Sequence, residues 1–193
     1  VGQKYRRVII LAPSHYGRFR GVSVLPFLHY ETPLGLVEVD QEATRRLLAH
    51  SLVASHHEAE IREHSLEIQL PFLQRTLSEF RLLPLLIGQT RLSCEDYRLL
   101  AEELKQYVDS QTLLIVSSDF THYGPRFGFV PFDRDVSDRI QALDSHALAR
   151  IEELDFDGFL SYVNRSGTNI CGFQPIALLL KILSEVDQGQ RLH

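Results

Sequence analysis

Short apolar runs alternate along the chain with segments of helical periodicity. The runs predict buried strands over Arg7–Leu11, Leu82–Ile87 and Thr112–Val116. A β-rich stretch from residue 21 to residue 39 carries a turn near Thr32–Gly35. Because strands that alternate with helices form βαβ units, we predict an α/β domain with a mainly parallel central sheet flanked by helices.

Capping residues indicate where some of the helices begin. Asp40 is the predicted N-cap of a helix with one apolar face. Ser93 and Asp96 form the capping-box pattern of a helix that runs to about Val108. Residues 55–60 are polar, and we expect them to form a loop between helices.

After this loop we expect a helix from about His64, which Pro71 either kinks or ends. Further helices are predicted over residues 133–151, 156–163 and 175–180, the last one well buried. The chain has no internal repeat, linker or low-complexity segment, so we expect a single domain over residues 1–193.

Composition narrows the function classes. Of the 193 residues, 44% are hydrophobic and 23% are charged, as is usual for a globular domain. The net charge of −5 gives no general attraction to nucleic acid or anionic lipid, and no apolar run approaches the ~20 residues of a membrane span. A phosphate-binding glycine loop, a dinucleotide fingerprint and a serine-hydrolase elbow are missing from the sequence.

Two further features of the composition concern the cellular location of the protein and the start of its sequence. The two cysteines make no disulfide framework, which favours a reducing, cytoplasmic location. The sequence contains no methionine and begins at Val1, so we expect that residues of the natural protein precede this position.

Histidines and a carboxylate follow two of the predicted strands. His15 lies in the loop after the first strand, and the segment Ser117–Gly124, with Asp119 and His122, follows the strand that ends at Val116. Ligands of open α/β sheets bind outside the carboxyl ends of the strands, so we expect these side chains to share a site. His15 is either a metal ligand or a loop histidine bonded to a nearby carbonyl group.

Asp119 and His122 are the stronger candidate pair. Asp119 can orient and polarise His122, which then serves as a ligand or as a general acid/base. The structural alternative is that Asp119 caps the amides of the loop while His122 packs against Tyr123.

Cys171 is the most chemically suggestive single residue, because it lies immediately before the predicted last helix. The positive end of the helix dipole favours a thiolate, which is a nucleophile and a soft metal ligand. Packing alone is the alternative explanation for this cysteine. Cys94 lies on the first turn of a helix and is expected to be inert.

Four other charged or polar residues are candidates for binding substrate or partner. His64 and Glu67 are three residues apart on a predicted helix face, where helix capping explains them equally well. Arg18 and Arg20 can meet an anionic group of a substrate, although solvated surface arginines are the more common case.

Several short motifs, taken together and in order, resemble those of the Memo family. They are Leu11–His15, Thr32–Gly35 with Val39–Asp40, Glu63–Glu67 with Leu70–Pro71, Ser117–Gly124, and Ile170–Gly172 with Pro175–Ile176. The resemblance covers residues 7–183. It implies a fold similar to class III extradiol dioxygenases, in a domain that lacks N-terminal and C-terminal segments of the family.

The resemblance also implies a metal site. Family members are expected to bind iron or copper through two histidines and a cysteine, and the motifs match His15 and Cys171 to two of these ligands. The other histidine belongs to an upstream His-Ala-Gly-Tyr motif that this sequence does not contain. His122 resembles the acid/base histidine of the dioxygenases, with Asp119 beside it, and a sulfur ligand favours Cu(I) or a more covalent iron site.

Three functional hypotheses follow. The first is a Memo-like protein that binds non-haem iron or copper, with a redox or dioxygenase-type activity on a small-molecule substrate. The second is a non-catalytic module that binds a phosphopeptide or partner protein in the same cleft, with Arg18, Arg20 and Arg126 as its cations. The third, weaker hypothesis is a cysteine-dependent hydrolase that uses Cys171, His122 and Asp119.

Overall fold

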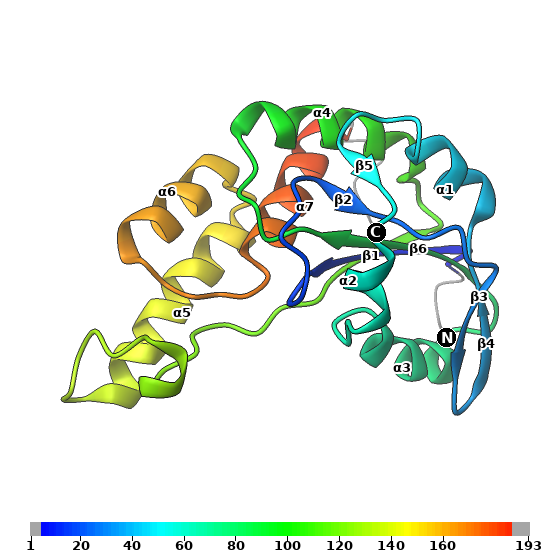
Figure 1. Ribbon diagram of the computed structural model, residues 1–193. Helices are drawn as coiled ribbons and strands as arrows, with labels where there is room; N and C mark the ends of the chain where they lie inside the picture. The colour runs from blue at the N-terminus through cyan, green and yellow to red at the C-terminus, as the bar shows by residue number, and fades with distance from the viewer. Residues whose placement is uncertain (1–4, 187–193) are drawn as a thin grey trace.

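The computed structural model describes residues 5–186 and has an α/β architecture (Figure 1). Its central sheet has the strand order β5-β2-β6-β1-β7, in which β1 is parallel to β6 and β7 and β2 is antiparallel to β6. These strands are β1 (Arg7–Pro13), β2 (Val22–Ser23), β5 (Val53–Ala54), β6 (Arg81–Ile87) and β7 (Thr112–Val116). The predicted α/β class with a mostly parallel central sheet flanked by helices is therefore confirmed.

Helices cover both faces of this sheet (Figure 1). One face carries α1 (Gln41–Leu47), α4 (Cys94–Leu104), α6 (Phe156–Ser166) and α7 (Phe173–Glu185). The other face carries α2 (His57–Ile61), α3 (Leu70–Thr76) and the hairpin of β3 (His29–Thr32) and β4 (Gly35–Glu38). Short 3₁₀ turns complete the fold: η1 (Glu67–Gln69), η2 (Lys105–Tyr107) and η3 (Pro125–Phe127).

The side chains of β1 show why the strands are apolar throughout. Ile9 and Leu11 pack into the core under α4 and α7, whereas Val8, Ile10 and Ala12 pack into the core under α2 and α3. Successive strand residues point to opposite faces, and both faces are covered, so a continuous apolar run is required.

The predicted caps are confirmed. The carboxylate of Asp40 accepts a hydrogen bond from the backbone N–H of Ala43 at 3.1 Å. Ser93 and Asp96 form both bonds of a capping box at the start of α4. The helix ends at Leu104, and η2 continues the chain to Tyr107, close to the predicted end.

Two local predictions between β5 and α3 are wrong. Part of the expected loop over residues 55–60 is helical, because α2 begins at His57. His64 does not begin a helix: η1 begins at Glu67, and α3 follows with Pro71 in its first turn. Proline has a fixed φ and needs no N–H at the start of a helix, so Pro71 begins α3 rather than kinking or ending one.

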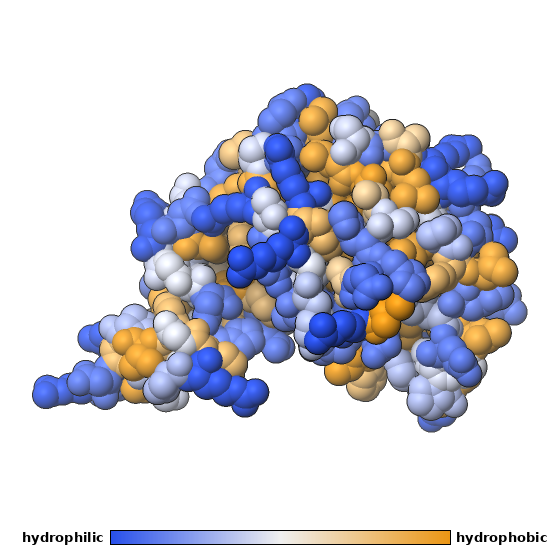
Figure 2. Space-filling view, viewed as in Figure 1, coloured by the Kyte–Doolittle hydropathy of each residue, from blue (hydrophilic) through white to orange (hydrophobic). Residues whose placement is uncertain are grey.

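The helix α5 (Val136–Glu152) packs against α6 and extends away from the sheet (Figure 1). The segment before it forms a projection that carries hydrophobic side chains (Figure 2), among them the half-exposed Phe127 and Val130. None of the helices between residues 5 and 186 combines the length and the apolar composition needed to cross a bilayer.

The strand register brings three loops to one edge of the sheet. Pro13 at the end of β1 lies opposite Ile87 at the end of β6, and Leu11 lies opposite Val116 at the end of β7. Just past these ends, the N–H of Ser14 donates to the Ile87 carbonyl oxygen at 2.8 Å. The residues that follow all three strands therefore leave the sheet at its carboxyl edge.

Candidate metal centre

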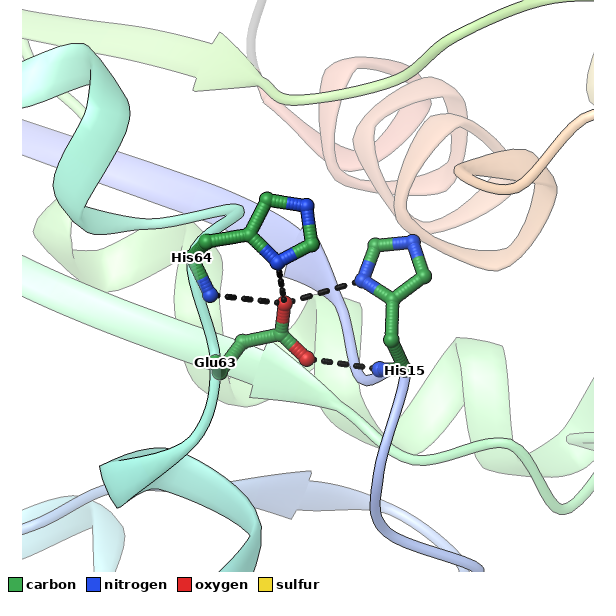
Figure 3. Close-up of side chains that lie close together, drawn as sticks. All are labelled: His15, Glu63 and His64. Atoms are coloured by element: carbon green, nitrogen blue, oxygen red, sulfur yellow. Dashed lines mark hydrogen bonds and ion pairs between the residues drawn. The ribbon is translucent and has the colours of Figure 1, made fainter.

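A buried carboxylate, Glu63, holds two histidines at this edge (Figure 3). Its side chain is 1% exposed, and its Oε1 lies 2.9 Å from Nδ1 of His15 and 3.3 Å from Nδ1 of His64. The carboxylate also accepts hydrogen bonds from the backbone N–H groups of His15, His64 and Ser65, at 2.6, 3.0 and 3.1 Å. The two imidazole rings stack, with centroids 4.9 Å apart.

These hydrogen bonds decide the charge of Glu63. Burial alone would raise the pKa of this carboxyl group, but the hydrogen bonds from His15 and Ser65 hold it below its usual range. Glu63 is therefore an anion near neutral pH, next to the two imidazole rings.

The segment that carries Glu63 and His64 is anchored to the end of β1. The hydroxyl of Ser65 donates to the carbonyl oxygen of Pro13 at 2.9 Å. The guanidinium of Arg62 lies over the ring of Tyr16, 4.7 Å from its centroid. Contacts on both sides of the histidine pair thus join the loop that carries His15 to the segment that carries His64.

A second cluster gathers Asp119, His122 and Cys171, whose ligand atoms all lie within 4.8 Å of one another. The backbone N–H of Asp119 donates to Sγ of Cys171 at 3.2 Å, and Sγ lies 3.6 Å from the carbonyl oxygen of Asp119. A carboxylate oxygen of Asp119 is 3.7 Å from Nε2 of His122. The cluster thus offers one sulfur, one nitrogen and one oxygen donor.

Hydrogen bonds between side chains and backbone groups join the β7 loop to the segment that leads into α7, and they hold this second cluster together. The side-chain amide of Asn169 accepts from the N–H of His122 at 2.9 Å and donates to its carbonyl oxygen at 2.7 Å. Gly172 donates its N–H to the hydroxyl of Ser118 at 3.1 Å. A Cβ at position 172 would lie 2.4 Å from Cβ of Ser118, so only glycine permits this approach.

A pocket of about 490 Å³ lies beside the second cluster, and Cys171 of that cluster lines it. It is lined by residues of the β1 and β6 ends and of the α6–α7 loop, including Ser14, Gln89, Arg91, Asn169 and Cys171. Ser14 is adjacent to His15, whose carbonyl oxygen accepts a hydrogen bond from the Gln89 side chain at 2.8 Å. A larger cavity of about 930 Å³ lies at the amino end of the strands and is lined by none of the predicted site residues.

The sequence-predicted residues therefore fall into two groups. Cys171 lies with Asp119 and His122, whereas His15 lies with His64 and with Glu63. His64 and Glu67 do not share a helix face, since His64 precedes η1, and Glu67 is exposed outside both clusters.

The predicted arginines differ in their surroundings, and Arg126 lies near the second cluster through Phe127, whose ring packs against His122. The guanidinium of Arg20 forms three hydrogen bonds to the carboxylate of Asp96, at 2.7, 2.8 and 3.0 Å, so it is engaged within the protein. Arg18 is exposed, and the guanidinium of Arg126 lies over the ring of Phe127. Their role in binding a substrate or a phosphopeptide stays a prediction.

Three residues near the clusters were not singled out from the sequence. Glu63 was placed only within a motif, although a carboxylate next to His64 is a signal in itself. Asn169 is two residues before Cys171, and Arg91 follows the end of β6 just as His15 follows the end of β1. The strand-end argument that identified His15 could also have identified Arg91.

The comparisons with known proteins agree with the motifs. The family model described as "Memo: Memo-like protein" matches residues 1–192. The chain belongs to the Memo family. Among curated Memo relatives, it is 33% identical to the Protein memo-1 homolog of Caenorhabditis elegans over 94% of this chain and 53% of the relative. It is 32% identical to a MEMO1 family protein of Thermococcus onnurineus, over 85% of this chain and 60% of the relative.

The same comparisons show how much of each relative's length this chain covers. Protein MEMO1 of Danio rerio is 32% identical over 95% of this chain and 64% of its own length. This chain thus spans less than two thirds of the length of these Memo relatives. Among solved structures, it is similar to uncharacterized protein JW3007 from Escherichia coli K12, with a TM-score of 0.53 and 14% identity over 91% of this chain and 75% of that one. At that identity the likeness shows the fold alone.

Proposed function

We propose that this Memo-family chain binds a redox metal ion, iron or copper, at the carboxyl edge of its sheet. Cys171 provides the sulfur ligand, with Asp119 and His122 next to the sulfur. The family resemblance makes His15 an imidazole ligand, although His15 lies in the other cluster, with Glu63 and His64. The observation that supports this most directly is the cluster of Cys171, Asp119 and His122, in which three donors of different kinds converge within 4.8 Å.

The donors fit such an ion. Thiolates suit Cu(I) and iron, and imidazoles suit copper and iron in either oxidation state. The backbone N–H of Asp119 donates to the sulfur, and α7 begins two residues after Cys171. When bound, the metal would supply one-electron redox chemistry, which the protein side chains lack.

The residues around the sulfur have separate tasks in this proposal. The 490 Å³ pocket admits a small-molecule substrate, and Arg91 offers it a cation. The ring of His122 packs edge-on against Phe127, 5.2 Å between centroids. In this proposal His122 exchanges a proton with a substrate beside Cys171. A dioxygenase-type reaction is the activity we propose to test first, and a cytoplasmic location stays a prediction.

The hydrolase hypothesis receives less support from the same geometry. A catalytic cysteine needs a hydrogen bond from its sulfur to the ring of a histidine base. The hydrogen bonds of Cys171 Sγ go to the backbone of Asp119 instead. We therefore favour a ligand role for Cys171 over a nucleophile role.

Metal analysis of Cys171→Ser tests the proposal. The protein is stripped with a chelator, reconstituted anaerobically with Fe(II) or Cu(I), and its bound metal is measured after gel filtration. We expect Cys171→Ser to lose most of the metal that the wild type retains. The matched control is Cys94→Ser, which replaces the exposed cysteine of α4 and should retain wild-type metal. Equal metal content in all three proteins would contradict the proposal.

A further inference from the structure

The pocket beside Cys171 has an uneven distribution of charge. Its volume of about 490 Å³ is usual for a small-molecule site. Among the described residues that line it, Arg91 is the one with a permanent charge, and none is an aspartate or a glutamate. A pocket with one cation and no acid in its wall attracts an anion.

Arg91 is held at this wall by two uncharged side chains. Its Nη2 donates to Oδ1 of Asn164 in the last turn of α6, and its guanidinium lies over the ring of Phe173 at the start of α7, 5.2 Å from the centroid. Between residues 5 and 186 no carboxylate forms an ion pair with Arg91, whereas Arg20 is paired with Asp96. The positive charge of Arg91 is therefore held in place without being neutralised.

The guanidinium of Arg91 keeps hydrogen-bond donors for a ligand. It carries five N–H groups in a planar fork, and Asn164 accepts from one of its nitrogens. The fork matches the two oxygens of a carboxylate. A phosphate monoester carries a charge of about −1.5 to −2 at pH 7, which one cation compensates only in part. A carboxylate, with its single negative charge, fits this wall better.

Most of the other walls of the pocket are apolar. Side chains from the ends of β1 and β6, from α6 and from the segment around the start of α7 line it: Pro13, Ile87, Val163, Ile170, Phe173 and Pro175. Such walls favour a ligand with a hydrocarbon or aromatic body, because binding then removes apolar surface from water.

Asp119 determines which end of the ligand meets which wall. Its carboxylate lies within 4.8 Å of the sulfur of Cys171 and is 86% exposed. An anionic group next to Cys171 would be repelled by this carboxylate, whereas the same group at Arg91 meets a cation. The charged end of a ligand therefore belongs at Arg91, and its uncharged end belongs at Cys171.

We infer that the pocket binds a small monocarboxylate with an apolar body, and that Arg91 determines this specificity. The carboxylate pairs with the free edge of the guanidinium, and the apolar body packs against Phe173 and Val163. The inference deepens the proposed function and rests on it in one respect, because a reaction at the uncharged end requires the metal at Cys171. The binding step itself requires only the pocket.

Calorimetric titration of the purified protein with phenylacetate, and with its uncharged counterpart phenylacetamide, tests the inference. The two molecules share ring and shape, so the difference in affinity measures the contribution of the carboxylate. The wild type should bind phenylacetate at least about fivefold more tightly than phenylacetamide, because the guanidinium adds charge-assisted hydrogen bonds that water weakens only in part. Acetate, which lacks the apolar body, should bind more weakly than phenylacetate.

Three variants assign the preference to Arg91. Arg91→Gln should weaken phenylacetate binding at least about fivefold and leave phenylacetamide binding nearly unchanged. Arg91→Lys keeps the charge without the fork and should show an intermediate preference. The matched control is Arg165→Gln, which removes an exposed arginine next to Asn164 that does not line the pocket, and it should change the affinity by less than about twofold. Arg91 is exposed, so thermal unfolding should show an intact fold in each variant.

Four results would overturn the inference. They are equal affinities of the wild type for phenylacetate and phenylacetamide, absence of phenylacetate binding, wild-type affinity in Arg91→Gln, and an equal loss of affinity in Arg165→Gln. The last result would show that the general field of the surface, and not the pocket, attracts the anion.

Metal content separates this inference from the proposed function. Arg91 belongs to neither ligand cluster, so Arg91→Gln should retain iron or copper as the wild type does. Loss of metal in Arg91→Gln would assign Arg91 to the metal centre and overturn its role in specificity. Retention of metal by Cys171→Ser contradicts the proposed function, while a carboxylate preference that depends on Arg91 still stands.

Discussion

The two ligand clusters of this protein are held in place by different means. In the first, the carboxylate of Glu63 is 1% exposed and accepts hydrogen bonds from the His15 ring and from three backbone amides, with the His64 ring 3.3 Å away. In the second, the carboxylate of Asp119 is 86% exposed, and backbone contacts between two loops position Cys171. One cluster is thus organised by a buried charge, and the other by the close approach of two chain segments.

This difference suggests which cluster mainly stabilises the fold and which one mainly binds a ligand. We expect Glu63 to stabilise the fold around it, because its oxygens already accept several hydrogen bonds. The exposed carboxylate of Asp119 lies 3.7 Å from Nε2 of His122, so we expect it to contribute little to folding and to be accessible to an ion or a substrate. The comparison therefore predicts that substitutions in the first cluster mainly change stability and geometry, whereas those in the second mainly change ligand binding.

Removal of Glu63 should have the largest effect. Glu63→Ala leaves the backbone N–H groups of His15, His64 and Ser65 without their acceptor, which should cost about 3 kcal/mol or more of unfolding free energy. Asp119→Ala should change it by less than about 0.5 kcal/mol. Urea denaturation of both variants measures the difference, and equal losses would break the comparison.

A neighbouring glutamate gives a pH-dependent contrast to Glu63. Burial raises the pKa of Glu60 to about 7, despite hydrogen bonds from the hydroxyls of Ser23 and Tyr30 that lower it. The folded state therefore binds more protons than the unfolded state between the ordinary value of 4.5 and about 7, so stability falls as pH rises through this window. Glu63 has a lowered pKa and acts oppositely, losing its contribution as pH falls through its folded pKa.

Glu60→Gln should remove the loss of stability that Glu60 causes as the pH rises from 4.5 to about 7. Glutamine keeps an acceptor for Ser23 but carries no charge, so the variant should gain on the order of 2 kcal/mol relative to wild type at pH 8 and little at pH 4.5. Thermal unfolding across this range measures the gain. A wild-type stability that stays flat between pH 4.5 and 7 would contradict the assignment to Glu60.

Gly172→Ala probes the close approach in the second cluster. The added Cβ would lie 2.4 Å from Cβ of Ser118, so the β7 loop and the start of α7 must separate. We expect a cost of about 1–3 kcal/mol in unfolding free energy and weaker metal binding at Cys171. Gly128→Ala has open space around its Cβ but a positive φ, and it serves as a control for backbone strain distant from the sulfur. Normal metal binding by Gly172→Ala would show that the approach does not position the ligands.

Asn169→Ala should have a smaller effect than Gly172→Ala. It removes the two hydrogen bonds between the Asn169 amide and the backbone of His122, at about 1 kcal/mol in stability. The chemical shifts of the His122 ring measure whether the histidine has moved. Unchanged shifts would show that other contacts fix the histidine.

The strands and caps could be predicted because their signals are local or strongly repeated. The run Val8–Leu11 is apolar on both faces, and the cap residues Asp40 and Ser93 act within one helical turn. The helix α2 was missed since it is short and contributes one buried residue, Ala59. Pro71 was misread because proline both ends helices and begins them, and only the packing of Leu70 and Leu73 decides between the two.

The candidate site was predictable in part. The carboxyl edge of the sheet follows from strand ends, which located His15, Asp119 and His122. The partner of His15 was not predictable, because Glu63 lies 48 residues away and no periodicity indicates which carboxylate is buried. The metal, its ligands and the catalytic roles stay predictions.

The most direct test of the central proposal is the X-ray absorption spectrum of the copper-loaded protein. A thiolate ligand from Cys171 predicts a sulfur atom in the first coordination shell, together with nitrogen from imidazole, and loss of the sulfur in Cys171→Ser. A first shell of nitrogen and oxygen alone in the wild-type protein would contradict the proposal.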